Sequence, residues 1–449
     1  MPIDKVNATA FSRDQEGYEE LRQSTVWNGR VPDRSPEVIV RPTDEAQVVE
    51  AVRYAREENM QIGVRSGGHS WSASFLRDDG MLIDLSGMTE ISVDHEARLA
   101  TVGPGVQGGE LLGALDGYGL SFPSGHSPSV AVGGFLLQGG FGWNSRKVGL
   151  GCENVVAVDA VTADGEVVRA DTDTNPDLYW AARGTGPGFF AVVTRFHLRL
   201  HPQPKVMSST YLFAEEDLDD LVCWAEEAQP DFPRCLEVSM FIGREQAGVP
   251  GVTVALRADA CGETEAEARE ALEVVDALPN SVRPLHREAF VTSTLGDLME
   301  WIDEQLGSRG RRYEVDNMWT DASAPELLPG IHAMVDSLPP HPSHLYLFFW
   351  GPTRTLPDMA FSMQAKLWLS YPAVGEDPSL DADHARLVAD GMRSMEALST
   401  GIQLADENLA ARPCPFMAEE NFRRSEQIRA IYDPDRRFHT YMGLPVEWR

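Results

Sequence analysis

Two adjacent glycines followed by a histidine are the most constraining feature of this sequence. They occur in the segment Arg-Ser-Gly-Gly-His at residues 65–69, after a short apolar-polar run at residues 61–64. Adjacent glycines allow positive φ angles and a close approach to a bulky planar ligand, and the imidazole that follows supplies a nucleophile. The alternative is an ordinary glycine turn followed by a hydrogen-bonded histidine. The flanking elements favour a cofactor site.

The residues on either side of this motif predict a strand, a helix and a second strand. A strand near residues 36–41 ends at a proline turn, and the helix at residues 47–58 carries Val48, Val49, Val52 and Ala55 on one face. Residues 81–88 predict the next strand, and a long glycine-rich stretch runs from residue 123 to 142.

Length and composition indicate a folded protein with two or three structural units. The chain has 449 residues, of which 43% are hydrophobic, enough for a sizeable core. Its first residues lack a basic-then-apolar signal, and no apolar stretch approaches the ~20 residues of a membrane helix. We therefore expect a soluble, cytoplasmic protein.

Charge and cysteine content narrow the possible partners. The net charge of -31 argues against nucleic acid or an anionic membrane, because both would be repelled. The five cysteines are an odd number without a Cys-x-x-Cys pair, so neither disulfides nor a metal site is expected, and most should be buried thiols. They are Cys152, Cys223, Cys235, Cys261 and Cys414.

A second glycine motif allows a different interpretation. Residues 103–108 fit Gly-x-Gly-x-x-Gly between a predicted strand and a helix, as in dinucleotide-binding folds. Against this, Pro104 removes a backbone donor, and no acidic residue stands about 20 residues further on to hold a ribose. An ordinary turn is the preferred interpretation.

The stretch at residues 123–142 carries the richest signal. Its glycine density predicts neither a helix nor a regular strand. The backbone amides that such a segment leaves exposed can cradle a pyrophosphate without cationic side chains.

The remaining pattern predicts an α+β protein. Residues 155–168 form two strands joined by the turn Asp164-Gly165, and a short helix near residue 176 precedes a strand at residues 191–196. Beyond residue 205, strands alternate with acidic helices, which suggests an antiparallel sheet flanked by helices. The candidate strands are residues 208–213, 237–242, 252–258, 344–350, 362–371 and 401–406.

The order of these pieces resembles the two-part FAD-binding domain of the vanillyl-alcohol-oxidase superfamily (PCMH-type flavoproteins), and within it the berberine-bridge-enzyme-like oxidases. The resemblance implies an FAD-binding domain at residues 1–204, a substrate domain at 205–411 and a return to the FAD domain at 412–449. It also implies that His69 is bonded covalently to the 8α-methyl group of FAD. Doubly linked members carry a Cys-Pro in the glycine-rich stretch, whereas this chain has Ser127-Pro128 and resembles a singly linked member.

The resemblance assigns further residues to the cofactor. Cys152 lies where relatives have no flavin bond, and Val130 lies where side-chain bulk controls oxygen entry. Gly188-Phe189-Phe190 departs from the common Asn-Phe-Gly, which puts individual contacts of that turn in doubt. The expected FAD contacts are Arg65, Ser66, Gly67, Gly68, His69, Ser70, Gly125, Ser127, Ser129, Val130, Gly133, Gly134, Gly139, Gly142, Asn154, Val193 and Tyr441.

Strand alternation and the resemblance together predict the substrate side. One face of the strand at 344–350 carries His344, Tyr346, Phe348 and Trp350, and one face of the strand at 362–371 carries Ser362, Gln364, Lys366, Trp368 and Ser370. Such a face could cover a flavin or simply be half-exposed. Relatives carry Gly-x-Tyr-x-Asn where Gln403 and Ala405 stand here. We expect Tyr441, Gln403, Lys366 and Trp368 to line one catalytic pocket, with Tyr441 nearest the reacting carbon.

These features predict an FAD-dependent oxidase that removes a hydride from a C–H bond next to oxygen or nitrogen and returns the electrons to O2 as H2O2. Its expected partners are a small-molecule substrate and O2, and the protein is expected to be a monomer or homodimer. A flavin dehydrogenase, a tailoring oxygenase of the same fold and an inert flavin carrier remain alternatives.

Overall fold

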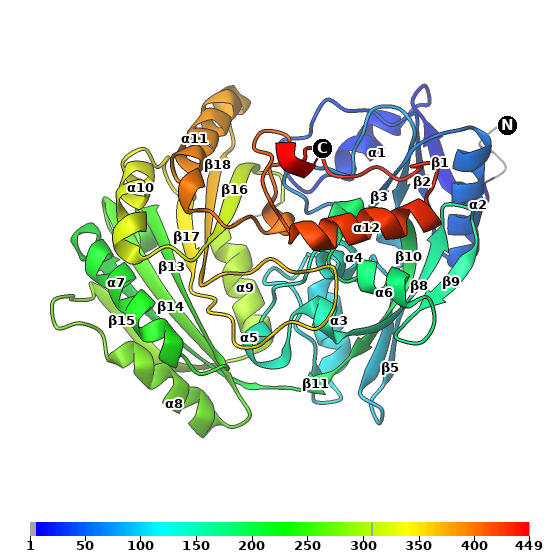
Figure 1. The fold of residues 1–449 in the computed structure, drawn as a ribbon. Helices are drawn as coiled ribbons and strands as arrows, with labels where there is room; N and C mark the ends of the chain where they lie inside the picture. Colours follow the sequence, from blue (N-terminus) through cyan, green and yellow to red (C-terminus); the bar gives the residue numbers. More distant parts are fainter. Residues whose placement is uncertain (1–5, 307–308, 449) are drawn as a thin grey trace.

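The chain forms two lobes that lie side by side (Figure 1). The computed structural model describes residues 6–306 and 309–448. The first part of the chain, blue to cyan, builds one lobe, and the middle part, green to orange, builds the other. The C-terminal helix, in red, lies against the first lobe.

The first lobe begins with a small mixed sheet. Three neighbouring strands are parallel, and the fourth, at one edge, pairs antiparallel with them. Helix α2 (Glu45–Glu57) starts at Asp44, whose side chain accepts a hydrogen bond from the amide of Gln47, so the predicted helix is confirmed. The sheet order is β1 (Thr9–Ser12), β2 (Val38–Arg41), β4 (Met81–Asp84) and β3 (Ile62–Arg65), and α1 (Tyr18–Ser24) precedes β2.

A second, antiparallel sheet completes this lobe. The predicted Asp-Gly turn joins two of its strands, with Gly165 at φ +74°. Its order is β5 (Ile91–Asp94), β6 (Leu99–Val102), β10 (Ala191–Arg199), β8 (Val155–Thr162) and β9 (Val167–Ala170). The short pair β7 (Leu120–Ser121) and β11 (His201–Pro202) and helices α3 (Gly108–Asp116), α5 (Ser145–Val148) and α6 (Pro176–Ala181) lie around it.

The glycines at 103–108 serve backbone packing. A Cβ at Gly103 would lie 2.2 Å from the carbonyl oxygen of Met88, and one at Gly105 would lie 2.5 Å from that of Leu85. The segment is therefore a tight turn between β6 and α3, and the dinucleotide interpretation has no support from its geometry.

One expectation for the glycine-rich stretch is wrong, because residues 132–137 form a short helix, α4 (Val132–Leu137). Val132 and Leu136, one turn apart, are buried in the core and stabilise this turn despite two glycines. Gly133 is needed for close approach, since a Cβ there would lie 2.2 Å from the hydroxyl oxygen of Ser66.

The second lobe is built on a seven-stranded antiparallel sheet. Helices α7 (Leu218–Ala228), α8 (Glu265–Asp276), α10 (Ala324–Asp336) and α11 (Asp381–Ser394) pack on its outer face, whereas α9 (Leu295–Leu306) covers part of the inner face (Figure 1). The strand order is β15 (His286–Ser293), β12 (Lys205–Ala214), β14 (Val252–Gly262), β13 (Leu236–Arg244), β17 (His344–Phe348), β18 (Leu367–Gly375) and β16 (Arg312–Thr320).

Several strand predictions in this lobe need correction. The edge strands β15 and β16 are absent from the predictions. The sequence of β15 lacks clean alternation, and in β16 the alternation holds only from Arg312 to Asp316. The strand expected at 362–371 begins only at Leu367, and residues 401–406 form a single bridge from Gly401 to Trp319 followed by the 3-10 helix η10 (Leu404–Asp406). The side chain of Asn317 bonds the backbone of this segment, which replaces strand pairing.

The C-terminal segment returns to the first lobe. Helix α12 (Glu419–Tyr432) ends beside α6, where the hydroxyl group of Tyr432 donates to Asp177 at 2.9 Å. Phe438 then bridges to Ile62 of β3, and the amide of His439 donates to the carbonyl of Ile62 at 2.9 Å. Residues near the C-terminus thereby pair with the first residue of the strand that leads into the histidine motif.

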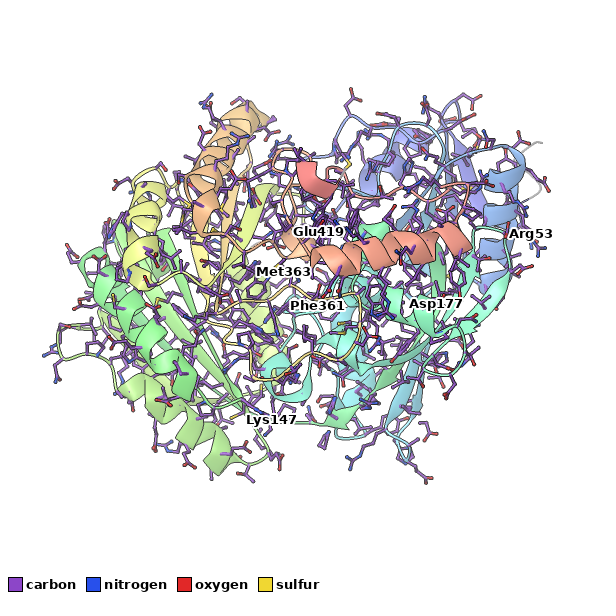
Figure 2. All side chains as sticks on the ribbon, viewed as in Figure 1. Arg53, Lys147, Asp177, Phe361, Met363 and Glu419 are labelled. Atoms are coloured by element: carbon purple, nitrogen blue, oxygen red, sulfur yellow. The ribbon has the colours of Figure 1, made fainter. Side chains whose placement is uncertain are left out.

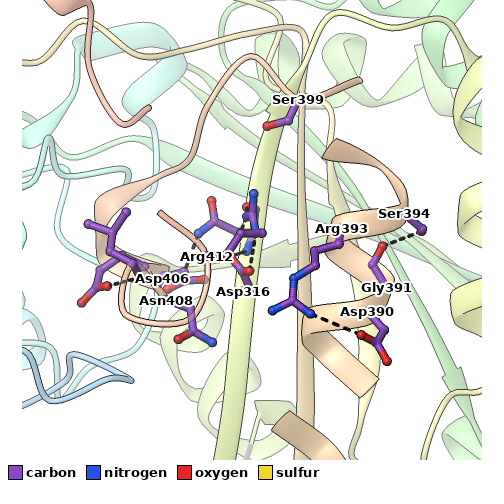
Figure 3. Close-up of polar contacts among 12 residues, drawn as sticks. Asp316, Asp390, Gly391, Arg393, Ser394, Ser399, Asp406, Asn408 and Arg412 are labelled. Atoms are coloured by element: carbon purple, nitrogen blue, oxygen red, sulfur yellow. Dashed lines mark hydrogen bonds and ion pairs between the residues drawn. The ribbon is translucent and has the colours of Figure 1, made fainter. Parts of the chain in front are cut away.

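The ion pair between Asp316 and Arg412 should be critical for the second lobe. Both side chains are at most 3% exposed, with Nε–Oδ2 and Nη2–Oδ1 distances of 2.6 and 2.7 Å (Figure 3). We expect Asp316→Ala to lower the free energy of unfolding by roughly 3–5 kcal/mol, because it leaves a buried charge unpaired. The exposed pair Asp383–Arg386 provides the control, and Asp383→Ala should cost less than about 1 kcal/mol. Equal losses in urea denaturation would contradict this assignment.

Candidate active site

A cavity of about 240 Å³ lies where the histidine loop, the glycine-rich stretch and the C-terminal return meet. The loops that follow β3 and β4 open onto it, as expected for the carboxyl ends of parallel strands. Its lining includes Gly67, Gly68, His69, Trp71, Val130, Gly133, Gly134, Val193, Ala405, Asp406, His439 and Thr440.

Arg65 fixes the start of the histidine loop. Its guanidinium donates to Asp84 at 2.5 Å and to the carbonyl oxygens of Thr25 and Gly67 at 3.0 Å each. These contacts use all three of its nitrogen atoms, so Arg65 shapes the loop. Arg65 also lines the cavity, and its contact with FAD stays a prediction.

The loop leaves backbone donors free for a ligand. In the described part of the chain, the amides of residues 67–70 donate to no backbone carbonyl, and Gly68 has φ +75°. Successive free amides form a nest that binds anions such as a diphosphate. Gly134 also lines the cavity, and a Cβ there would meet no atom within 4 Å, so it would project into open space. These features fit an FAD molecule.

His69 is held in a defined orientation. Its Nε2 lies 3.1 Å from the hydroxyl oxygen of Ser129, and its ring stacks on Trp27 with centroids 4.8 Å apart. Burial lowers the pKa of His69 to about 3. The imidazole is therefore neutral at physiological pH and retains a lone pair for bond formation.

The predicted cofactor residues in the glycine-rich stretch and near it divide into two groups. Ser66, Ser70, Val130, Gly133, Gly134 and Val193 line the cavity together with His69. Ser127 and Ser129 lie behind it, with their hydroxyl oxygens 3.2 Å apart, and Gly125 packs against Val130.

Gly139, Gly142 and Asn154, also predicted as FAD contacts, lie outside the cavity lining and have structural roles. A Cβ at Gly139 would collide with Phe361, and one at Gly142 would lie 2.0 Å from the carbonyl oxygen of Ser124. Asn154 donates to the carbonyl oxygen of Leu150 at 3.0 Å. Each of these residues permits loop packing beside the cavity.

Most of the cysteines are buried, as the sequence predicts. All five are free thiols, and four are buried. The sulfur atoms of Cys152 and Met359 are 3.7 Å apart, and burial raises the pKa of the Cys152 thiol. Cys152 is a core residue outside the cavity lining.

Tyr441 does not take the place predicted for it. Its hydroxyl group donates to the carbonyl of Thr185 at 2.7 Å, and its ring packs 4.3 Å from that of Phe416. A Cβ at Gly188 would lie 2.4 Å from this hydroxyl oxygen. Burial raises the pKa of Tyr441, so the phenol stays neutral. Tyr441 supports the 186–188 turn from behind and is no candidate base.

The predicted convergence of Gln403, Lys366 and Trp368 with Tyr441 is also wrong. Lys366 precedes β18 and lines a small hollow beside Val222 of α7, on the outer face of the sheet. Gln403 is buried outside the cavity lining. Trp368 does lie on the inner face, where its Nε1 donates to Asn317 at 2.9 Å.

The inner face of the large sheet carries the aromatic set that the alternation predicts. Leu345, Leu347 and Phe349 pack under the outer helices, so Tyr346, Phe348 and Trp350 point the other way. The crossing loop that carries Phe361 and Met363 runs between the lobes (Figure 2). Phe361 packs on Phe141 of the glycine-rich stretch, with ring centroids 5.6 Å apart.

Asp406 is a cavity residue absent from the sequence-based predictions, as are Trp71 and His439. Its carboxylate accepts hydrogen bonds from Nε1 of Trp71 at 2.7 Å and from the hydroxyl group of Ser370 at 3.4 Å, so it joins the two lobes. Burial raises the pKa of Asp406 to about 6, although both hydrogen bonds oppose the rise. A carboxylate with this pKa can accept a proton near neutral pH.

Asn317 positions the segment that carries Asp406. Its side-chain amide donates to the carbonyl oxygens of Gln403 and Asp406 at 3.1 and 2.8 Å, and its Oδ1 accepts from the amide of Gln403 at 2.7 Å. Arg412 donates to the backbone carbonyl of Asn317 at 2.6 Å, beside its ion pair with Asp316 (Figure 3).

Among residues 6–306 and 309–448, no group of His, Cys, Asp and Glu is arranged to hold a metal ion. Within the same residues, no helix has the length and apolar character needed to cross a bilayer.

Comparisons with known proteins agree with the geometry. A family model described as an FAD binding domain matches residues 36–171. The chain is 34% identical over 438 residues to FAD-linked oxidoreductase nodO of Hypoxylon pulicicidum, covering 94% of this chain and 93% of that one. The fold matches 6-hydroxy-D-nicotine oxidase from Arthrobacter nicotinovorans with a TM-score of 0.83 at 23% identity, over 98% of both chains. It matches BBE-like 1 of Physcomitrella patens with a TM-score of 0.80 at 20% identity, over 99% and 98% of the chains. The chain therefore belongs to the FAD-linked oxidoreductases of the vanillyl-alcohol-oxidase superfamily.

Proposed function

We propose that this protein is an oxidase that carries FAD covalently on His69 and oxidises a C–H bond next to oxygen or nitrogen in a small organic substrate. The observation that carries the proposal is one cavity that joins a nest of free amides, a neutral histidine and the ionisable Asp406. FAD, when bound, supplies the hydride acceptor. The electrons pass to O2, with H2O2 as product.

The surroundings of His69 support covalent attachment. Ser129 and Trp27 hold the ring from two sides, and the low pKa keeps the imidazole unprotonated. Ser127 replaces the cysteine of doubly linked relatives, and Cys152 lies outside the cavity lining. We therefore propose a single bond to the protein.

Asp406 is the group best placed to handle the substrate's proton. It lies at the cavity between Trp71 of the first lobe and Ser370 of β18 in the second lobe. Oxidation next to a hydroxyl or amino group requires loss of a proton from that group, and an adjacent carboxylate accepts it. The similarity to 6-hydroxy-D-nicotine oxidase supports amines as one substrate class to test.

The overall proposal is tested by incubating the holoenzyme with amines, alcohols and sugars and measuring H2O2. Release of H2O2 with any of them supports an oxidase. Flavin reduction without H2O2 would indicate a dehydrogenase, and no flavin reduction across the panel would indicate an inert carrier.

Covalent attachment predicts that acid precipitation leaves the yellow colour in the pellet. A peptide map should show one flavin-bearing peptide, which contains His69. His69→Ala should release the flavin on precipitation and oxidise substrate more slowly, because the 8α-histidyl bond makes the flavin a stronger oxidant. His95→Ala, which removes a ring stacked on Tyr118, should change neither property. A flavin-Cys152 adduct would exclude this assignment.

Asp406→Asn should lower the rate of flavin reduction by about 10²–10⁴-fold while flavin content is retained. In the wild type, this rate should rise as pH increases through about 6, because the carboxyl group must lose its proton before it can act as a base. The exposed Asp383→Asn is the control. Unchanged single-turnover reduction in Asp406→Asn would remove Asp406 from the reaction.

Val130→Ile tests access of O2 to the cavity. Val130 lines the cavity and packs against Gly125, so an added methylene group narrows this region. We expect slower reoxidation of the reduced flavin by O2 at an unchanged rate of flavin reduction, measured by stopped flow. Val167→Ile, at an exposed strand position, is the matched control. Equal reoxidation rates in both variants would place the O2 path elsewhere.

A further inference from the structure

Glu237 is a buried carboxylate that lacks a full set of partners. It lies on β13, and only 6% of the residue is exposed. Its Oε1 accepts a hydrogen bond from the amide of Asn144 at 2.9 Å. Its Oε2 has no hydrogen-bond partner among the residues that the structure describes. Burying a charged oxygen without a donor is costly, so a nearby cation is needed to offset it.

Two cationic side chains lie near this carboxylate. The buried guanidinium of Arg146 attracts Glu237 electrostatically, but it donates its hydrogen bonds to the carbonyl oxygens of Trp350 and Pro233 at 2.8 and 2.9 Å. His126 is the group that can bring a positive charge directly to Oε2. Its Nε2 lies 3.7 Å from Oε2 of Glu237, and its ring stands edge-on to Trp143 with centroids 4.4 Å apart. At 3.7 Å a neutral imidazole makes no hydrogen bond, whereas an imidazolium is still attracted to the carboxylate.

Among the other titratable groups of this region, Asp406 favours a charged His126, whereas Tyr346 and the Arg257–Asp259 pair add little net charge. Asp406 of η10 interacts with it electrostatically, and the positive charge lowers the pKa of Asp406. Burial raises the pKa of Tyr346 on β17, so its phenol is neutral. Arg257 and Asp259 on β14 pair with each other at 2.8 Å and largely cancel.

The chain places His126 beside residues of the cavity. It follows Gly125, where a Cβ would lie 3.3 Å from the Cβ of Val130. The next residue, Ser127, contacts Ser129, which in turn contacts His69. His126 is thus adjacent to the segment where we propose that O2 enters.

We propose that His126, held as an imidazolium by Glu237, is the positive charge that promotes reduction of O2. The inference rests on the oxidase activity proposed above. The first electron converts O2 to an anion, which a fixed cation stabilises. Overall, singly deprotonated reduced FAD, O2 and one proton yield oxidised FAD and H2O2. His126 acts through its charge and keeps its own proton, and Glu237 is a positioning residue.

The first test needs no substrate. The holoenzyme is reduced with dithionite, freed of excess reductant and mixed with O2 in a stopped-flow instrument. His126→Gln and Glu237→Gln should each slow reoxidation by about tenfold or more, whereas His95→Gln should match the wild type. His126→Arg, which keeps a positive charge at this place, should reoxidise faster than His126→Gln.

The second test follows the charge itself. In NMR spectra of the histidine rings at neutral pH, the His126 resonance, assigned by its loss in His126→Gln, should have the chemical shift of an imidazolium in the wild type and should move toward that of a neutral ring in Glu237→Gln. Identical shifts in the two proteins would overturn the role of Glu237.

The outcomes separate this inference from the proposed function. Rapid reoxidation of both wild type and His126→Gln would overturn the role of His126 and leave the oxidase intact. Slow reoxidation of the wild type in air would instead overturn the oxidase proposal, and with it this inference.

Discussion

The buried ion pair between Arg65 and Asp84 is the constraint on which the cofactor cavity depends. Asp84 is fully buried at the end of β4, and it accepts hydrogen bonds from Arg65 at 2.5 Å and from Arg41 at 2.8 Å. Burial alone would raise the pKa of Asp84, but the two arginines bring it below its usual value. Because Arg65 also holds the carbonyl oxygens of Thr25 and Gly67, the ion pair sets the path of the histidine loop and leaves its amides free for a ligand.

On the substrate side, the position of Asp406 depends on hydrogen bonds and an ion pair made by residues of the edge strand β16. Asn317 replaces strand pairing at residues 403–406 with side-chain hydrogen bonds, and Arg412 ties the chain that follows to Asp316. These hydrogen bonds hold Asp406 at the boundary between the lobes, where Nε1 of Trp71 and the hydroxyl group of Ser370 donate to its carboxylate. An acidic group with a raised pKa is thereby held by rigid elements of both lobes, which is what preorganised proton transfer requires.

The first lobe was predictable from sequence because the constraints on its backbone are local. Glycines that permit close approach, such as Gly67 and Gly133, stand at fixed positions relative to strands, so the motif and the loop path follow together. The substrate side was not, because Asp406 acquires its role through Asn317, a residue about 90 positions away on an edge strand whose alternation ends at Asp316. Lys366 was misplaced for a related reason, since β18 begins one residue after it and the face assignment for residues 362–366 fails.

The buried carboxylates of the second lobe differ more in their ion-pair and hydrogen-bond partners than in their solvent exposure. Asp316 is paired with Arg412, and Asp259 with Arg257 and Ser208, so each has donors that offset its desolvation. Glu237 is buried to a similar extent, yet it keeps one oxygen without a donor beside His126. Its other oxygen accepts from the amide of Asn144, and the buried Arg146, which also attracts the carboxylate, gives its hydrogen bonds to backbone carbonyl oxygens. The proposed imidazolium of His126 offsets the remaining oxygen, and the same positive charge can then act on O2.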